Sequence, residues 1–389
     1  MSGPRFLEAL AADLDSLSAE HRRRACPELA GSDRIHPIRH GSLVLAFASN
    51  DYLGLASHPA IASAAAESAA LHGFGAGAAR LVTGSLPPHQ ELESDIATFL
   101  GLPDCLLFPT GYQANIGVIT ALAGPTDLIV SDQANHASLI DGCRLSRATV
   151  RIYPHGDARA ARAALSEGTF RRRLLVTESL FSMDGDVAPV PELADAATAA
   201  GAALVVDEAH ALGVLGPNGR GICASAGIQP DVLVGTLGKA FGSAGGFAAG
   251  GTPLRAYLLN HARTFIFTTA PPPPVAAAAS AAVHLAAGPD GHRRRAALAA
   301  NRDHLARRLE ALGLLPSPRP AAAIIPVILG PNDRALAAAA ALLQSGIFVP
   351  AIRPPTVPDG TARLRVTLSA NHTAAEIDRL ADALTGALA

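Results

Sequence analysis

From about residue 100 the chain alternates between short apolar runs and helix-like stretches, and this alternation limits the folds that it can adopt. Each run is rich in Val, Leu or Ile, is bounded by Gly, Pro, Arg or Asp, and ends in polar residues. The runs are CLLFPTG (105–111), DLIVSD (127–132), RRLLVTES (172–179), AALVVDEAH (202–210) and PDVLVGTLG (230–238). Strands that alternate with helices form βαβ units. We therefore expect an α/β fold: a mostly parallel central sheet with helices on both faces.

The segments on either side of this region have other patterns. Apolar residues at positions 6, 7, 10, 14 and 17 have helical spacing, which predicts an amphipathic helix, and LVLAFAS (43–49) predicts a strand. After the proline-rich TAPPPP (269–274) come two long helical stretches, two strand-like runs and a last helix from Thr373. These patterns predict an N-terminal arm (1–45), a large domain (46–285) and a small α+β C-terminal domain (286–389).

Charge and cysteine content narrow the classes of partner. The formal net charge is −2, so neither nucleic acid nor a membrane is an expected partner. The four cysteines have no C-x-x-C spacing, which predicts reduced thiols, a cytoplasmic location and no metal site. Glu8, Asp13 and Asp15 interrupt any signal-peptide pattern, and the Ala-rich stretch 274–288 favours a buried helix over a membrane span.

Five polar turns follow the five strand-like runs, where an open α/β sheet binds ligands. The last turn, TLGKAFG (236–242), contains Lys239, the one lysine of the chain. Every other basic side chain of the Lys and Arg group is Arg, which does not lose its proton and cannot act as an amine nucleophile. Lys239 is therefore a candidate for covalent chemistry.

The motif DEAH (207–210) raises the alternative of a nucleotide hydrolase. That function requires a G-x-x-x-x-G-K-[ST] loop before the acidic motif. Here Ala240 follows Lys239 where Ser or Thr is required, Leu233 stands five residues before Gly238, and this loop follows the acidic motif. We reject nucleotide hydrolysis for these reasons. The glycine-rich segment 73–84 follows a helical stretch, so it does not indicate a dinucleotide site either.

The residues at the strand ends fit pyridoxal phosphate. This cofactor needs an amine for its aldehyde, an anion for its ring nitrogen, donors for its phosphate and a contact on its ring face. Lys239 and Asp207 supply the amine and the anion. Gly111 and Tyr112 open a helix whose N–H groups suit a phosphate, and Thr236 adds a hydroxyl. His136 can stack on the ring and His210 can reach its phenolic oxygen. Each residue alone has an ordinary structural explanation; their joint occurrence favours the cofactor.

Long motifs in the same order resemble a known family. FASNDYLGL, LFPTGYQAN, SDQANHASLIDG, SLFSMDGDVAPV, VVDEAHALGVLGPNGRG and GTLGKAFGSAGG resemble the α-oxoamine synthases, which are fold-type I pyridoxal phosphate transferases, over nearly the whole chain. The segment AIRPPTVPDGTARLRVTLSA (351–370) resembles the biotin-pathway branch of that family. The sister branches share the core motifs and usually lack the Arg-Pro-Pro-Thr-Val-Pro stretch.

The resemblance implies a reaction in which L-alanine and a pimeloyl thioester condense with loss of carbon dioxide. Lys239 would release the cofactor to alanine and then remove the alanine α-proton. The acyl carrier would be coenzyme A or acyl carrier protein. The resemblance further implies that Ser182, like His210, contacts the cofactor, and that Asn50 and Arg353 hold the alanine carboxylate. Substrate contacts are also implied for Arg22, His136 and Thr356.

The resemblance also implies a homodimer with its active site at the subunit interface. Thr268 and Thr269, in FIFTTA (265–270), would reach a phosphate in the partner chain. Two alternatives stay open. One is a sister synthase, such as a glycine C-acetyltransferase, that uses glycine and a shorter acyl-CoA. The other is a pyridoxal phosphate-binding regulator without synthase activity, against which the chain carries no basic DNA-binding domain.

Overall fold

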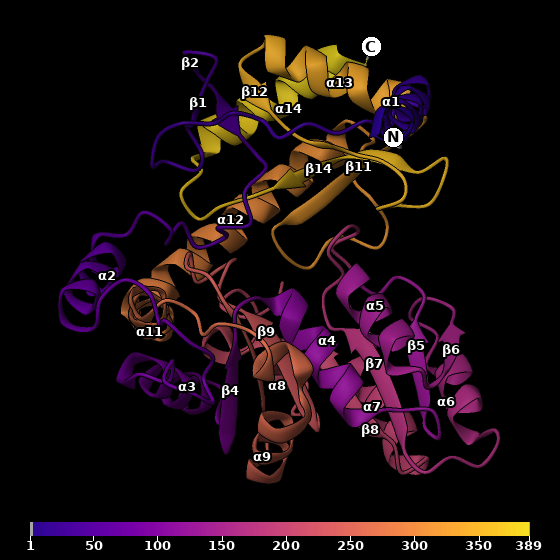
Figure 1. Ribbon diagram of the computed structural model, residues 1–389. Coiled ribbons are helices and arrows are strands. Elements are labelled where there is room, and N and C mark those ends of the chain that lie inside the picture. Colours follow the sequence, from indigo (N-terminus) through magenta and orange to yellow (C-terminus); the bar gives the residue numbers. More distant parts are fainter. Residues whose placement is uncertain (1–2, 389) are drawn as a thin grey trace. The chain divides into compact units, whose positions relative to one another are not determined.

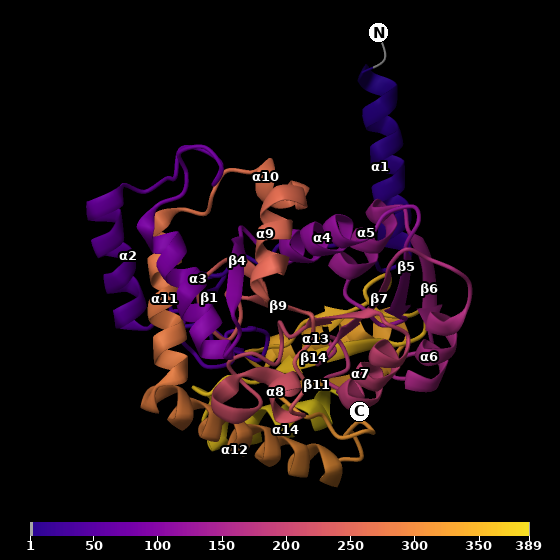
Figure 2. The same ribbon diagram turned by 90° about the horizontal axis from the view of Figure 1, so that it is seen from below.

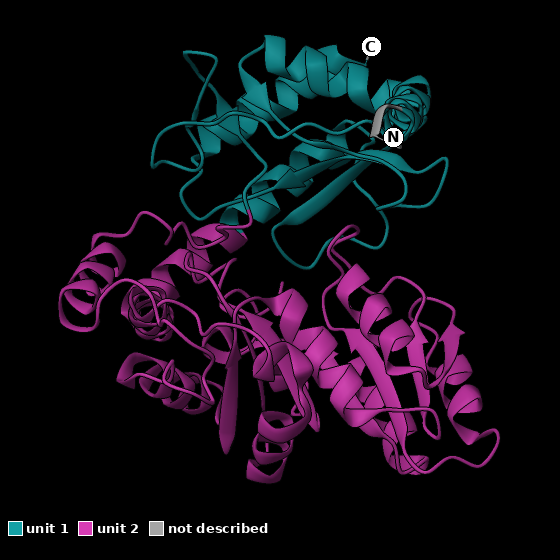
Figure 3. Ribbon diagram, viewed as in Figure 1, with its two compact units in different colours: residues 1–49, 300–389 teal, residues 50–299 magenta. Residues whose placement is uncertain are grey.

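The structure is a computed structural model that describes residues 3–388. Contacts divide the chain into two compact units (Figure 3). One unit is residues 50–299, and the other joins residues 1–49 to residues 300–389. The domain boundaries predicted from the sequence, after residue 45 and after residue 285, stay a prediction. Both termini therefore belong to one folding unit.

The 50–299 unit is built on a seven-stranded sheet with the order β4-β10-β9-β8-β7-β5-β6 (Figure 1). All neighbours in β9-β8-β7-β5-β6 are parallel, whereas β10 runs antiparallel to both β4 and β9. The expected mostly parallel sheet is confirmed. Its strands are β4 (Asp104–Phe108), β5 (Leu128–Asp132), β6 (Thr149–Tyr153), β7 (Arg173–Glu178), β8 (Ala203–Asp207), β9 (Val232–Thr236) and β10 (Gly246–Gly250).

Helices cover both faces of this sheet, because alternate strand residues point to opposite sides. On one face Ile129, Val176 and Val205 pack against α4 (Gly111–Leu122), α5 (Ala137–Ser146), α9 (Thr252–His261) and α10 (Arg263–Ile266). On the other face Val130, Leu175 and Val206 pack against α6 (Ala158–Ser166), α7 (Val190–Ala199) and α8 (Gly221–Ser225). The result is a three-layer core in which the sheet lies between two layers of helices.

Three further helices belong to this unit: α11 (Pro273–Ala287) packs on both α2 (Pro59–His72) and α3 (Pro87–Leu100) (Figure 2). The Ala-rich stretch 274–288 lies almost wholly in α11, whose buried residues include five alanines. Small side chains let neighbouring helices approach closely. The expectation of a buried helix for this stretch is confirmed, and a short 3-10 turn η1 (Pro217–Gly219) completes the unit.

The other unit contains a three-stranded antiparallel sheet, β11-β14-β13, with helices α12 (Pro289–Ala311), α13 (Asn332–Gln344) and α14 (Ala374–Leu388). The boundary at residue 300 falls inside α12. The strands are β11 (Ile324–Gly330), β12 (Ile347–Phe348), β13 (Ala351–Ile352) and β14 (Ala362–Thr367).

The N-terminal segment belongs to this unit because it pairs with the C-terminal part of the chain. The run 43–49, expected to be one strand, splits into β2 (Ser42–Leu43), which pairs with β1 (Ile38–Arg39), and β3 (Leu45–Ala46), which pairs with β12. The Phe47 ring stacks on His372 at 4.3 Å. The expected amphipathic helix is α1 (Gly3–Ala19), whose large apolar side chains are exposed and which extends away from the rest of its unit in Figure 2.

Candidate active site

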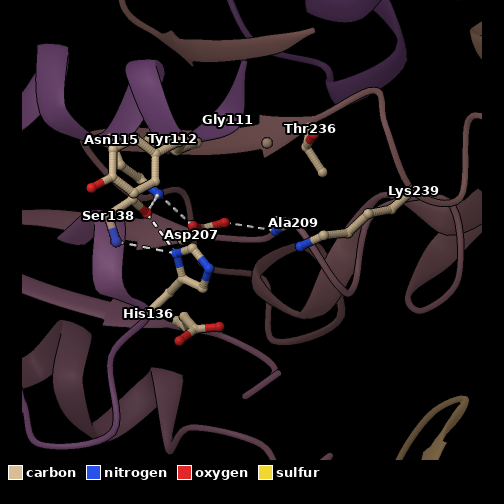
Figure 4. A pocket seen from close by; sticks show the side chains of 12 residues that line it. Gly111, Tyr112, Asn115, His136, Ser138, Asp207, Ala209, Thr236 and Lys239 are labelled. Atoms are coloured by element: carbon tan, nitrogen blue, oxygen red, sulfur yellow. Dashed lines mark hydrogen bonds between the residues drawn. The ribbon is translucent and has the colours of Figure 1, made fainter. Parts of the chain in front are cut away.

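A cavity of about 150 Å³ lies at the carboxyl end of the parallel strands of the 50–299 unit (Figure 4). It brings together six of the residues singled out in the sequence, with six others. The twelve lining residues are Gly111, Tyr112, Asn115, His136, Ser138, Glu178, Asp207, Ala209, Val234, Gly235, Thr236 and Lys239. They lie at or just after the ends of β4, β5, β7, β8 and β9, so all five strand ends contribute to one cavity.

Asp207 is the last residue of β8 and is 6% exposed. Both of its carboxylate oxygens accept hydrogen bonds. Asn115 Nδ2 donates to Oδ2 at 2.7 Å, and the Ala209 backbone N–H donates to Oδ1 at 2.8 Å. Asn115 also donates to Ser138 Oγ at 2.9 Å, which fixes the amide. The carboxylate is therefore held in one orientation against the cavity.

Lys239 lies in the loop between β9 and β10, and its side chain extends toward the turn after Asp207 (Figure 4). Its Nζ is 2.8 Å from His210 Nε2. His210 Nδ1 is 2.7 Å from the Tyr52 hydroxyl, which donates to Asn50 Oδ1 at 3.1 Å. A hydroxyl has one proton, so in this arrangement His210 donates from Nδ1 to Tyr52 and accepts at Nε2 from Lys239. His210 thus holds the amine of Lys239 through a defined tautomer.

His136 is the N-cap of α5. Its Nδ1 accepts from the Ser138 backbone N–H at 3.2 Å and lies 2.8 Å from Ser138 Oγ. Burial lowers the pKa of His136, although the nearby Asp207 carboxylate opposes this effect. A lowered pKa keeps the imidazole neutral near pH 7, and a neutral ring can pack on the face of an aromatic ligand.

The start of α4 forms a cradle beside Thr236. A Cβ on Gly246 would lie 2.4 Å from the Gly111 nitrogen, and a Cβ on Gly111 would lie 3.3 Å from the Thr236 Cβ. These two glycines therefore allow the helix start to approach the end of β9. Thr236 Oγ1 accepts from the Gly238 N–H at 3.2 Å and donates to the Gly245 carbonyl. Free N–H groups at a helix start attract a phosphate.

Ser182, Thr268 and Thr269 are not among the twelve lining residues. Ser182 is buried in the turn after β7, whereas Thr268 is half-buried and Thr269 exposed after α10. In the loop after β6, His155 lies between two carboxylates. Its Nδ1 is 2.9 Å from Asp132 and its Nε2 is 2.7 Å from Asp186. These bonds raise the pKa of His155 to about 10. A charged histidine therefore ties the turn that carries Ser182 to the end of β5.

Arg22, Arg353 and Thr356 belong to the other unit. There Arg24, rather than Arg22, donates to Thr356 Oγ1, at 3.1 Å. Arg22 pairs with Glu20 at 2.9 Å. Arg353 donates to the carbonyl of His21 and, at 3.5 Å, to that of Arg23. Residues 21–24 therefore lie along the segment 353–356. The substrate contacts expected of Arg22, Arg353 and Thr356 stay predictions.

Tyr52, Asn115 and Glu178 are among the residues of the site that the sequence-based set did not contain. Tyr52 stands in the FASNDYLGL motif, Asn115 in LFPTGYQAN and Glu178 at the end of β7. Asn and Tyr suggest no particular chemistry by type, and a Glu at a strand end is common at a surface. In the part of the chain that the structure describes, no group of His, Cys, Asp or Glu could hold a metal ion. Residues 3–388 likewise contain no helix long and apolar enough to cross a membrane.

Comparisons with known proteins show which family this chain is similar to. Residues 43–384 match the family model for class I and II aminotransferases. A curated 8-amino-7-oxononanoate synthase from Bordetella petrii is 48% identical over 385 residues, covering 97% of each chain.

Two solved structures extend the comparison. A lysine-to-alanine variant of serine palmitoyltransferase from S. paucimobilis, solved with a bound PLP–myriocin aldimine, superposes with a TM-score of 0.92 at 30% identity. The match covers 98% of this chain and 97% of that one. An 8-amino-7-oxononanoate synthase from Francisella tularensis has a TM-score of 0.77 at 29% identity, covering 88% and 97%.

Proposed function

The chain belongs to the 8-amino-7-oxononanoate synthase family within the class I and II aminotransferases, and from this premise we propose how its residues carry out the reaction. It condenses L-alanine with a pimeloyl thioester to 8-amino-7-oxononanoate, carbon dioxide and the free thiol, an early step of biotin biosynthesis. The observation that supports this function most directly is the single lysine of the chain, which lines one cavity together with Asp207 and His136.

The cofactor of this reaction is pyridoxal 5′-phosphate, and the donor set of the cavity fits it. Lys239 offers an amine and Asp207 an acceptor for the protonated ring nitrogen. The start of α4 offers N–H groups to the phosphate, in the cradle that the glycines at 111 and 246 leave open, and the Thr236 hydroxyl would turn from the Gly245 carbonyl to donate to it. Bound there, the cofactor supplies an aldehyde that bonds to an amine and a ring that takes up negative charge.

The residues around the cofactor then have distinct tasks. Lys239 holds the cofactor at rest, and its Nζ moves the alanine α-proton during turnover. His210 accepts a hydrogen bond from Nζ, so it would orient the amine of Lys239 before the cofactor binds to it and after the cofactor is released. Asp207 keeps the ring nitrogen protonated, and His136 packs on the ring. Ser182, like His210, would contact the cofactor or its phenolic oxygen.

Further residues that the family resemblance implies would hold the substrates. Asn50 and Arg353 bind the alanine carboxylate, for which a planar guanidinium can form two parallel hydrogen bonds. Thr356 and the arginines of the segment 22–24 lie on the side of the acyl chain. Its carrier is coenzyme A or acyl carrier protein.

The working form in this proposal is a cytoplasmic homodimer. Phe74, Val82 and Phe267 are 69–74% exposed, and the Ala270 N–H donates to the Ala78 carbonyl, which joins the two segments that carry them. Exposed apolar side chains of this size favour burial against another chain. Thr268 and Thr269 lie within the same surface and would face the partner's phosphate. Sedimentation of a fully active monomer would contradict the dimer.

A panel of substrates tests the function. Purified protein with PLP would be incubated with alanine, glycine or serine and with pimeloyl-CoA, pimeloyl acyl carrier protein or acetyl-CoA. Mass spectrometry of the products should show 8-amino-7-oxononanoate from alanine and a pimeloyl thioester. A faster reaction of glycine with acetyl-CoA would instead assign the chain to the glycine C-acetyltransferase branch. The absence of any product in all combinations would favour a binding protein.

A further inference from the structure

Three carboxyl groups end three neighbouring strands at the edge that carries the cavity. Asp132 ends β5, Glu178 ends β7 and Asp207 ends β8, and Glu178 stands directly opposite Asp207 in the strand register. All three are buried, with exposed fractions of 2%, 2% and 6%. Like charges placed so close together in a buried site disfavour each other's ionisation.

Asp132 and Asp207 have groups that compensate their charge. Asp132 accepts from the backbone N–H groups of Ala134 at 2.8 Å and Gly156 at 3.0 Å, and it pairs with His155. Asp207 accepts at both oxygens, as described above. Burial alone would raise the pKa of Asp132, but the bonds from His155 and the two amides lower it overall.

Glu178 lacks such compensation. The nearby His136 backbone amide lowers the pKa of its carboxyl, but Oε1 has no hydrogen-bond partner although it is buried. The charged or titratable groups that act on it are Asp207, Asp132 and Lys239. Two of the three are acidic. A buried carboxylate with an unpaired oxygen is costly, and such a group takes up a proton instead.

We propose that Glu178 is a positioning residue that keeps its proton in the working protein. Its neutral carboxyl holds the backbone of His136 at the start of α5, and it leaves Asp207 as the one anion among the twelve residues that line the cavity. A second negative charge there would compete with Asp207 for the protonated ring nitrogen. This role beside the cofactor rests on the proposed function, whereas the protonation of Glu178 does not.

The titration of Glu178 agrees with this role. Burial, followed by the charge of Asp207, raises the pKa of Glu178 to about 8, and Lys239 opposes the shift. In the unfolded chain the carboxyl loses its proton near its model value of 4.5. The folded protein therefore binds one more proton between these values, so this group makes stability fall as pH rises from about 4.5 through about 8.

The test compares Glu178→Gln, which imitates the protonated acid, with Glu178→Ala, which leaves the His136 amide without its acceptor. Infrared difference spectra of the full chain, wild type minus Glu178→Gln at pH 7, should show the carbonyl stretch of a protonated carboxyl. Titration should convert it to a carboxylate band near pH 8. In the control variant Asp207→Asn the neighbouring charge is gone, and the midpoint of this titration should move to lower pH.

Activity and stability give two further readouts. With PLP bound, Glu178→Gln should lose less turnover at pH 7 than Glu178→Ala, which should lose about tenfold or more. The melting temperature of Glu178→Gln should fall less than that of the wild type between pH 5 and pH 8. A carboxylate band alone at pH 7, or a Gln variant as inactive as the Ala variant, would overturn the proposal. The infrared spectra show whether Glu178 is protonated even if the wild type makes no 8-amino-7-oxononanoate. A failure of the proposal for Glu178 can therefore be told apart from a failure of the proposed function.

Discussion

His155 should stabilise the protein in a pH-dependent way, because it is a charged histidine between two carboxylates. Its pKa rises from 6.5 to about 10, mainly through the bond to Asp132 and then that to Asp186. By itself this pKa shift corresponds to about 5 kcal/mol of the free energy of unfolding. The side chain is 35% exposed, so solvent screening reduces the contribution to about 2 kcal/mol. Because the folded pKa is raised, the contribution is complete below about pH 6.5 and is lost as pH rises through about 10.

The variant His155→Gln keeps the approximate size of the side chain and removes the charge. In a chain of 389 residues a loss of about 2 kcal/mol lowers the melting temperature by about 2 to 3 °C. We expect this difference from the wild type at pH 6 and its decline toward pH 10, measured by scanning calorimetry without cofactor. The matched control is His284→Gln, because His284 also pairs with an aspartate, Asp95 at 3.2 Å, but is 66% exposed. A difference that is equal at pH 6 and pH 10 would refute the reasoning.

Three substitutions test the tasks assigned around the cavity. Asp207→Asn should keep the fold, because Asn is nearly isosteric with Asp. It should lower kcat about 100-fold or more, since the ring nitrogen loses its charged partner. Near-native turnover would remove Asp207 from the site. Tyr52→Phe should shift the pH profile of kcat, because the Nδ1 proton of His210 loses its acceptor. An unchanged profile would exclude this role. Arg353→Lys should raise KM for alanine far more than kcat falls, because an ammonium group replaces a planar guanidinium that can form two parallel hydrogen bonds. An unchanged KM would place Arg353 elsewhere.

The central sheet could be predicted because its strands are buried on both faces. Such strands are continuous apolar runs, as in LLVTE and ALVVD, and their boundaries came within a few residues of β7 and β8. The pattern did not indicate β6 or β10. The sequence of β6 is TVRIY, an edge strand that is mostly exposed, and that of β10 is GFAAG, whose small residues have low strand propensity. Both form because their neighbours offer hydrogen bonds, which is a tertiary effect.

The N-terminal segment shows a second limit. One apolar run at 43–49 suggested one strand, but Leu45 pairs with Ile347 while Leu43 pairs with Ile38. Pairing with a partner about 300 residues away depends on the folded chain rather than on local pattern. The same cause explains why the contacts join the N-terminal residues to the C-terminal ones in one unit.

The candidate site was predictable where the residue type suggests its chemistry. A lone lysine, an aspartate at a strand end and two histidines have few alternatives once they follow consecutive strands. Tyr52 and Glu178 were not predictable in this way. The tyrosine matters because its hydroxyl lies 2.7 Å from His210, and the glutamate because burial leaves one of its oxygens without a partner. Both properties are set by packing, and no local motif encodes them.

The most direct test of the central claim is to trap the cofactor on Lys239. The chain has one lysine, so a lysine-specific protease can cut it only after that residue, giving two large fragments. After reduction of the PLP-loaded protein with borohydride, mass spectrometry should find a pyridoxyl group on Lys239 and no cut there. The variant Lys239→Arg keeps the charge and should lose the yellow colour and the turnover together. A reduced wild type that is still cut after residue 239, or a Lys239→Arg variant that still makes 8-amino-7-oxononanoate, would contradict the account.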